Sequence, residues 1–179
     1  MCPQIPLNLR NPAALTKHIG THILFGNRAR LGDNPCGFCL STDGSCKIWL
    51  DRRRGKNRSV YVDLARSRCP NKSKLSLGQP KDDKVRCTNK PIYCPIEDCA
   101  DTVPAFWTYN LLIHLTKVHG LEGPRLTKYK ELYEVSAEEL KFMKKEETKI
   151  RNSRTTAAKL QRNHDWTISE AHRITPPKQ

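Results

Sequence analysis

The stretch that decides the fold runs from residue 94 to residue 119 and reads CPIEDCADTVPAFWTYNLLIHLTKVH. It holds two cysteines and two histidines at the spacing Cys94-x4-Cys99-x14-His114-x4-His119. A structural zinc ion takes four such ligands in a tetrahedron, with the two histidines about one helical turn apart. Phe106 and Leu111 occupy the positions where a ββα finger keeps its small apolar core. The spacing therefore predicts a C2H2 zinc finger over residues 92–120.

The helix of this finger is poorly suited to reading a DNA sequence. Counting back from its first histidine, the three base-reading places fall on Trp107, Asn110 and Ile113. Asparagine pairs well with adenine, but tryptophan and isoleucine make few contacts that distinguish one base from another. Only Lys117 is basic within residues 91–120. We therefore expect a structural finger, or one that contacts a protein.

A second group of metal ligands lies upstream and in reverse order. A histidine pair, His18-x3-His22, comes first, and Cys36-x2-Cys39 follows after 13 intervening residues. Chain order does not matter to a metal ion, so these residues predict an inverted module with two imidazole and two thiolate ligands. The competing arrangement is an all-thiolate site that leaves both histidines without a metal, made of Cys36, Cys39, Cys46 and Cys69. We favour the inverted module.

Four cysteines remain outside these pairs, and their role is open. Cys46, Cys69 and Cys87 would need a fourth ligand to make a further metal site, drawn from Cys2, His164 and His172. A buried free thiol is the commoner fate of an isolated cysteine. The N-terminus lacks the features of a secretory signal, so we expect the thiols to be reduced and intracellular. Two zinc ions are expected, and the leftover thiols leave room for a third.

Composition favours a fold that depends on metal. Of the 179 residues, 37% are hydrophobic and 7% aromatic, so a large continuous core is not expected. Small domains with thin cores gain stability from bound metal. The formal net charge is +14, and residues 51–90 alone hold 13 basic and 4 acidic side chains. This excess of positive charge predicts a polyanionic partner.

The positive charge peaks in a predicted hairpin tip. Residues 47–50 and 59–64 alternate apolar and polar side chains as strands do. Between them, five basic groups fall within seven residues: Arg52, Arg53, Arg54, Lys56 and Arg58. We expect these side chains to bind the phosphates of DNA or RNA, or to act as a nuclear-import signal. A solvated loop without a partner is the alternative.

The chain divides into six predicted segments. They are a tail (1–12), the inverted module with its hairpin (13–69), a linker (70–91), the finger (92–120), a helical segment (121–163) and a disordered tail (164–179). Asn11-Pro12 predicts the start of a helix. Ser136 with Glu139 three residues later predicts a capping box at the start of a charged helix.

The sequence offers little for catalysis. It has no glycine-rich phosphate loop, no nucleophile elbow and no H-E-x-x-H helix. A small metal-dependent nuclease is the remote alternative, but it needs a water on the metal, whereas both predicted sites have four protein ligands. No run of about 18 apolar residues is present, which excludes a membrane-spanning helix. We expect no enzyme, no small-molecule substrate and no membrane contact.

Several short motifs follow one another over most of residues 15–172. They are HIGTHIL from residue 18, PCGFCL from 35, CPN from 69, CTNKP from 87, CP from 94, PAFWTYNL from 104 and ISEAH from 168. In their order the chain resembles a group of uncharacterised C2H2-type zinc-finger proteins of mushroom-forming fungi, a multiplied, transposon-like family. The resemblance implies zinc binding and does not imply any catalysed reaction. It also implies that Cys46, Cys69 and Cys87 belong to the family's pattern, which favours a further metal-binding role for them. The four-residue gap between Cys94 and Cys99 departs from the usual two.

Together these observations predict a small, metal-stabilised α+β protein with a finger, an inverted module, a β-hairpin and a charged C-terminal helix. We expect it to be nuclear and to bind nucleic acid through Arg52–Arg58, with the fingers holding the geometry. The alternative is a protein-interaction adaptor, in which the finger would display Trp107, Tyr109 and Ile113 to a partner.

Overall fold

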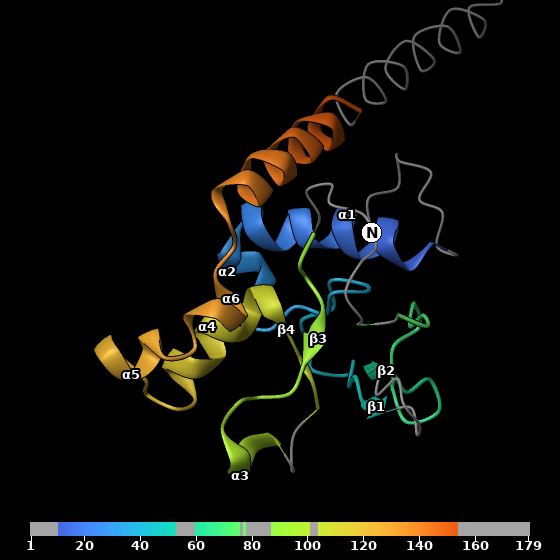
Figure 1. Cartoon of the computed structure of the whole chain (residues 1–179). Coiled ribbons are helices and arrows are strands. Elements are labelled where there is room, and N and C mark those ends of the chain that lie inside the picture. Colours follow the sequence, from blue (N-terminus) through green and yellow to red (C-terminus); the bar gives the residue numbers. More distant parts are fainter. Residues whose placement is uncertain (1–10, 53–59, 76, 78–86, 101–103, 154–179) are drawn as a thin grey trace, which may run out of the picture.

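The computed structural model describes residues 11–52, 60–75, 77, 87–100 and 104–153 (Figure 1). In chain order its elements are α1 (Pro12–Phe25), α2 (Arg28–Leu31), β1 (Leu50–Arg52), β2 (Val60–Val62), β3 (Pro91–Ile92), α3 (Glu97–Ala100), β4 (Phe106–Trp107), α4 (Thr108–Lys117), α5 (Gly123–Thr127) and α6 (Lys130–Tyr133). A further helix is described over residues 137–153. This is a small mixed α/β fold with two short two-stranded sheets. Within the described ranges we find no helix with the length and hydropathy needed to span a bilayer.

Helix α1 begins where the sequence predicts it. Asn11 adopts an extended backbone, and its side chain accepts a hydrogen bond from the backbone N–H of Ala14 at 3.1 Å. Proline at the first helical position costs no hydrogen bond there. Leu15, Ile19 and Ile23 recur at helical spacing and are at most 1% exposed. This buried stripe fixes which way the helix faces.

The predicted hairpin is present, but its first strand is β1 at Leu50–Arg52 and not residues 47–50, and β2 is shorter than the predicted strand over 59–64. β1 and β2 pair antiparallel, with Leu50 opposite Val62. Below this ladder, Lys47 pairs with Arg68 through N–H···O bonds of 3.0 and 2.7 Å. The second sheet pairs β3 with β4, and the N–H of Ala105 donates to the carbonyl of Ile48 at 2.8 Å. This bond links the two sheets to each other.

One hydrophobic core runs through the segments that the sequence divides. It combines buried residues of α1, the cysteine-rich loop, the hairpin, β4, α4 and the C-terminal helix. Leu75 and Leu77, in the segment predicted as a linker, pack against this core and hydrogen-bond with the backbone of β2. This part of the predicted linker therefore belongs to the folded structure.

The cysteine-rich loop and the α4 region meet at a tight contact. Trp107 is 2% exposed, and its ring meets Phe38 edge-on at a centroid distance of 4.9 Å. A Cβ atom at Gly37 would lie 2.1 Å from the ring of Trp107. Only glycine fits there, because real carbon atoms do not approach so closely. The two cysteine-bearing regions are thus packed directly on each other.

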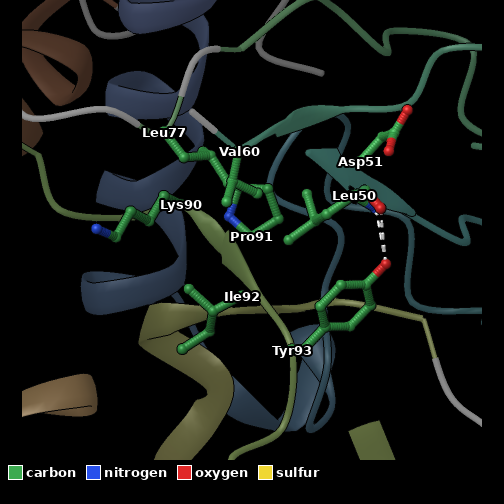
Figure 2. A pocket seen from close by; sticks show the side chains of 8 residues that line it. All are labelled: Leu50, Asp51, Val60, Leu77, Lys90, Pro91, Ile92 and Tyr93. Atoms are coloured by element: carbon green, nitrogen blue, oxygen red, sulfur yellow. Dashed lines mark hydrogen bonds between the residues drawn. The ribbon is translucent and has the colours of Figure 1, made fainter. Parts of the chain in front are cut away.

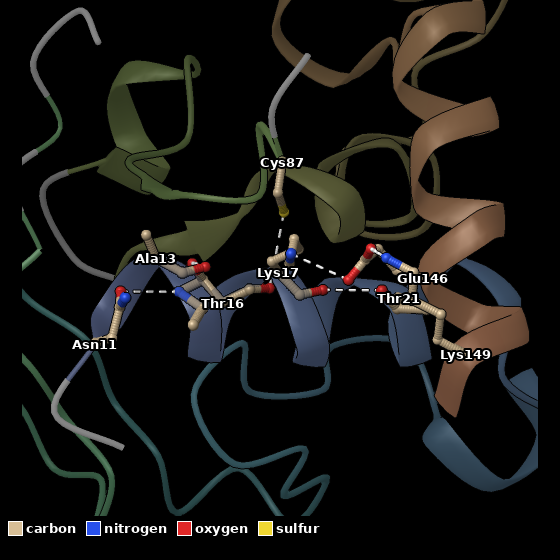
Figure 3. Close-up of polar contacts among 9 residues, drawn as sticks. Asn11, Ala13, Thr16, Lys17, Thr21, Cys87, Glu146 and Lys149 are labelled. Atoms are coloured by element: carbon tan, nitrogen blue, oxygen red, sulfur yellow. Dashed lines mark hydrogen bonds and ion pairs between the residues drawn. The ribbon is translucent and has the colours of Figure 1, made fainter. Parts of the chain in front are cut away.

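The helix over 137–153 is attached to α1 and α4 by polar contacts. Ser136 caps it by accepting a hydrogen bond from the backbone N–H of Glu139 at 3.1 Å, which confirms one half of the predicted capping box. The side chain of Glu139 instead points inward and accepts hydrogen bonds from Tyr109 and Thr88. Figure 3 shows the ion pair between Lys17 and Glu146, whose charged atoms are 3.0 Å apart. The helix therefore belongs to the folded structure.

Candidate metal centres

The downstream group of ligands converges as predicted. Its donor atoms all lie within 4.8 Å of one another and belong to Cys94, Cys99, His114 and His119. The Sγ of Cys94 lies 3.3 Å from the Nε2 of each histidine. The two Nε2 atoms are 3.1 Å apart, and the Sγ of Cys99 is 3.5 Å from the Nε2 of His114. Tetrahedral zinc with ordinary bond lengths separates such ligands by about 3.3–3.8 Å, so the group fits this ion.

A small apolar cluster holds these ligands in place. Phe106, Leu111, Leu115 and Leu121 pack with the two cysteines, which confirms the predicted core positions of Phe106 and Leu111. The ring of Phe106 stacks on His114 at a centroid distance of 3.8 Å. The backbone N–H of Leu121 donates to the carbonyl of Leu115 and closes the end of α4 around His119. Packing on Phe106 thus orients the imidazole of His114, and the ring of His119 meets that imidazole edge-on.

The surroundings of His114 favour the neutral form of its imidazole, which is the form that binds a metal. Burial, together with the nearby His119, lowers the pKa of His114 to about 4. The imidazole is therefore neutral at pH 7 and offers its lone pair to a metal. Burial and the neighbouring Cys94 raise the pKa of Cys99 to about 11. A divalent cation would favour its thiolate, because metals bind the deprotonated form.

The upstream group is the all-thiolate arrangement. Its four sulfur atoms also lie within 4.8 Å of one another and belong to Cys36, Cys39, Cys46 and Cys69. The Sγ atoms of Cys36 and Cys69 are 3.8 Å apart, and those of Cys39 and Cys46 are 3.4 Å apart. Four thiolates around zinc are separated by about 3.8 Å. The site is therefore a second candidate metal centre, with four sulfur ligands.

The backbone of the first cysteine pair folds as a turn that aims both thiols at one point. The N–H of Leu40 donates to the carbonyl of Cys36 at 2.8 Å, and the N–H of Phe38 donates to the Sγ of Cys36 at 3.5 Å. Leu40 takes a positive φ of 62° to close the turn. Non-glycine residues adopt this conformation at a cost, which the surrounding structure must offset.

The predicted inverted module is not what the structure shows. Within the described part of the chain, Cys36 and Cys39 group with Cys46 and Cys69 and not with His18 and His22. The reason lies in the hairpin, since the pairing of Lys47 with Arg68 brings the neighbouring Cys46 and Cys69 side by side. The sequence contains a signal for this grouping, because Cys46 precedes the first strand of the hairpin and Cys69 follows the second strand.

The close approach of the upstream thiols shifts the pKa values of Cys36, Cys39 and Cys69. The hydrogen bond from Cys36 lowers the pKa of Cys39 to about 2, while the hydrogen bond to Cys39 raises the pKa of Cys36. The hydrogen bond with Cys36 lowers the pKa of Cys69, but Cys39 and burial outweigh it and raise that pKa to about 12. Four thiols this close cannot all ionise without a cation between them. A divalent ion would remove this conflict.

Cys87, predicted as a further ligand, lies in neither group. Its Sγ lies 3.8 Å from the carbonyl oxygen of Thr16 (Figure 3) and 3.5 Å from the hydroxyl of Tyr109. Burial raises its pKa to about 11, so the thiol stays protonated at neutral pH. Of the leftover thiols within the described residues, Cys46 and Cys69 join a metal group and Cys87 does not. Cys2, His164 and His172 lie outside the described residues.

The finger's predicted contact face is covered by the rest of the protein. Trp107 is 2%, Tyr109 6% and Asn110 1% exposed. The side-chain amide of Asn110 donates to the carbonyl of Pro35 at 2.9 Å. These side chains are therefore too buried to reach a base. Of the three side chains predicted to face a protein partner, Trp107 and Tyr109 are buried, whereas Ile113 is half-buried. The adaptor alternative itself stays a prediction.

Of the five basic residues predicted for the hairpin tip, only Arg52 lies within the described residues. Arg52 ends β1 and Val60 begins β2, while Arg53, Arg54, Lys56 and Arg58 lie outside the described residues. At the base of the hairpin, five more basic side chains are exposed and form no ion pair with another described residue: Lys47, Arg66, Arg68, Lys72 and Lys74. Sequence reasoning passed over these five individually, although the charge count of residues 51–90 contains four of them.

A hollow of about 570 Å³ opens beside the hairpin (Figure 2). Its lining is mostly apolar and includes Leu50, Val60 and Ile92, with Lys90 at its rim. Tyr93 joins the two sheets across it, since its hydroxyl donates to the carbonyl of Leu50 at 2.9 Å and accepts from the N–H of Leu50 at 3.1 Å. The hairpin is thus fastened to β3 as well as to the upstream thiols.

Comparisons with protein-family models, with curated proteins and with solved structures gave no match. The resemblance to the fungal zinc-finger group therefore stays a prediction. What the structure itself supports is metal binding by two groups of four cysteine and histidine residues.

Proposed function

We propose that this protein binds nucleic acid through phosphate contacts made by a metal-clamped basic hairpin. The observation that carries the proposal is the position of the upstream thiols. Cys46 precedes the hairpin and Cys69 follows it, and both join Cys36 and Cys39 in one group. An ion held there would fix the base of the hairpin rigidly. The five basic residues of positions 52–58 would then project from a fixed support.

Charge around the hairpin supports the same partner. The exposed Lys47, Arg66 and Arg68 lie at its base, close in sequence to two of the thiols. Phosphate contacts from lysine and arginine give affinity without sequence specificity. Since Trp107 and Asn110 are buried, base readout by α4 plays no part in the proposal. Double-stranded DNA, single-stranded DNA and RNA are all candidates at this level.

The bound ions would be zinc and would serve the fold. Thiolate and imidazole are the ligands of structural zinc, and four protein ligands leave no position for a reactive water. For this reason we do not favour the nuclease alternative and propose no enzymatic activity. In this proposal, β3, β4 and α4 form a ββα-type C2H2 finger around the downstream ion. Nuclear localisation, with the hairpin tip as import signal, and membership of the fungal zinc-finger group belong to the same proposal.

Charge reversal in the hairpin tip tests the function. We expect the zinc-loaded full chain to bind a 30-mer duplex in a fluorescence anisotropy titration, with a log–log salt slope of about −4 to −5 if five phosphates are neutralised. The double variant Arg53→Glu/Arg54→Glu should weaken binding by roughly 10- to 100-fold at moderate salt and flatten the slope by about 2. Single-stranded DNA and RNA of equal length distinguish the preferred nucleic acid.

The control variant carries the same change in charge elsewhere. Lys141 and Lys145 are exposed on the C-terminal helix and form no ion pair with another described residue. Lys141→Glu/Lys145→Glu should therefore weaken binding far less than the hairpin variant. Equal weakening by both variants would show that total charge, and not the hairpin, attracts the polyanion. No binding by the wild-type chain to any of the three nucleic acids at moderate salt would refute the proposed function.

A further inference from the structure

The two histidines that the upstream thiols leave behind form a pair of their own on α1. The Nε2 atoms of His18 and His22 are 3.2 Å apart, and the two rings meet edge-on with centroids 4.8 Å apart and an interplanar angle of 84°. His18 is 6% exposed, and His22 is partly buried. From this geometry we propose that His18 and His22 bind a third metal ion, separate from the two four-residue groups.

The downstream metal group supplies an internal standard for this geometry. Its histidines, His114 and His119, place their Nε2 atoms 3.1 Å apart, with ring centroids 4.9 Å apart and an interplanar angle of 84°. The two pairs thus agree within 0.1 Å in both distances and share the same ring angle. Two nitrogens bound to one tetrahedral zinc ion are separated by about 3.3 Å. The α1 pair therefore has the arrangement of two imidazoles aimed at one ion.

The helix holds the pair rigidly. Leu15, Ile19 and Ile23 anchor one face of α1 in the core. On another face, Lys17 forms its ion pair with Glu146 of the C-terminal helix (Figure 3). A fixed helix backbone keeps residues four apart within reach of a shared ion. The site therefore needs no rearrangement of α1 to accept a metal.

The ligand set suggests the class of metal. Imidazole suits zinc, copper, nickel and cobalt, whereas calcium and magnesium need oxygen ligands. In the described residues no third cysteine, histidine or carboxylate joins this pair within a common ligand sphere. The remaining coordination positions would be filled by water. The expected ion is thus a first-row divalent cation such as Zn²⁺.

Counting metal ions tests this site. Native mass spectrometry of the full chain, loaded with Zn²⁺ and then desalted, should show three bound ions. The double variant His18→Gln/His22→Gln should show two. A wild-type chain that retains only two ions, or a double variant that retains as many as the wild type, would overturn the site. The two imidazoles would then simply share a hydrogen bond.

A second measurement covers the case in which the double variant fails to fold. Histidine side-chain nitrogen NMR of the wild-type chain follows each imidazole during a Zn²⁺ titration. The third equivalent should shift the Nε2 resonances of His18 and His22 and leave those of His114 and His119 unchanged. If the α1 pair shows no shift up to three equivalents, the proposal is wrong. This outcome would leave the two four-residue groups and the nucleic-acid proposal untouched.

Discussion

Replacing Cys69 by serine is expected to release the ion of the upstream thiol group and to unfold the protein. Cys69 is 7% exposed and connects the end of the hairpin to Cys36 and Cys39. Structural zinc contributes an apparent free energy of about 10–16 kcal/mol in finger peptides. This is as large as the whole net stability of a typical domain, about 5–15 kcal/mol. Circular dichroism and native mass spectrometry should show lost structure and one missing ion.

Cys87→Ser is the matched control, because it makes the same chemical change at a half-buried thiol outside both groups. The Cys87 thiol contacts only Thr16 and Tyr109 among its hydrogen-bond partners in the described residues. We expect this variant to keep both zinc groups loaded and to lose on the order of 1 kcal/mol of stability. If Cys69→Ser and Cys87→Ser behave alike, with full metal content in both, the thiol group is not a metal site.

Replacing Glu139 by alanine is expected to lower the free energy of unfolding by about 3–5 kcal/mol. Glu139 is 3% exposed and accepts hydrogen bonds from the N–H and hydroxyl of Thr88 and from the hydroxyl of Tyr109. Burial, followed by the nearby Cys87, raises the pKa of Tyr109, so this hydroxyl remains a donor. Removing the carboxylate leaves the buried Tyr109 hydroxyl, and the N–H and hydroxyl of the more exposed Thr88, without their acceptor. Denaturant unfolding measures the loss, and faster hydrogen exchange in residues 137–153 would locate it.

Glu138→Ala provides the comparison for this prediction. Glu138 is exposed on the same helix, one residue away, and removing it changes charge and helix propensity equally. Exposed substitutions of this kind usually change stability by less than about 0.5 kcal/mol. A Glu139→Ala protein as stable as Glu138→Ala would mean that the inward carboxylate does not hold the C-terminal helix in place.

Sequence reasoning was most successful where ligands and packing residues are close along the chain. Cys94 and Cys99, the histidines of α4 and the apolar positions Phe106 and Leu111 lie within one segment, so spacing alone assembles them. The start of α1 could be predicted for the same reason, because Asn11 and Pro12 act on the turn that follows them. All of these features depend on interactions between residues that are close in sequence.

Features that depend on tertiary contacts were predicted wrongly or not at all. Cys36 and Cys39 were assigned to the nearer histidines, whereas the pairing of Lys47 with Arg68 brings in more distant cysteines. Glu139 was expected to complete a capping box, but donors contributed by two other segments draw its side chain inward. The burial of Trp107 depends on Gly37, seventy positions away in the chain. No local pattern contains these partners.

The most direct test of the metal-clamped fold is zinc X-ray absorption spectroscopy on the His18→Gln/His22→Gln chain, combined with its metal count. The two described groups contain six cysteines and two histidines. We therefore predict that this variant holds two zinc ions, with an average of three sulfur and one nitrogen ligand for each ion. A single bound ion, or two ions with an average of two sulfur and two nitrogen or oxygen ligands each, would contradict an all-thiolate site at the base of the hairpin.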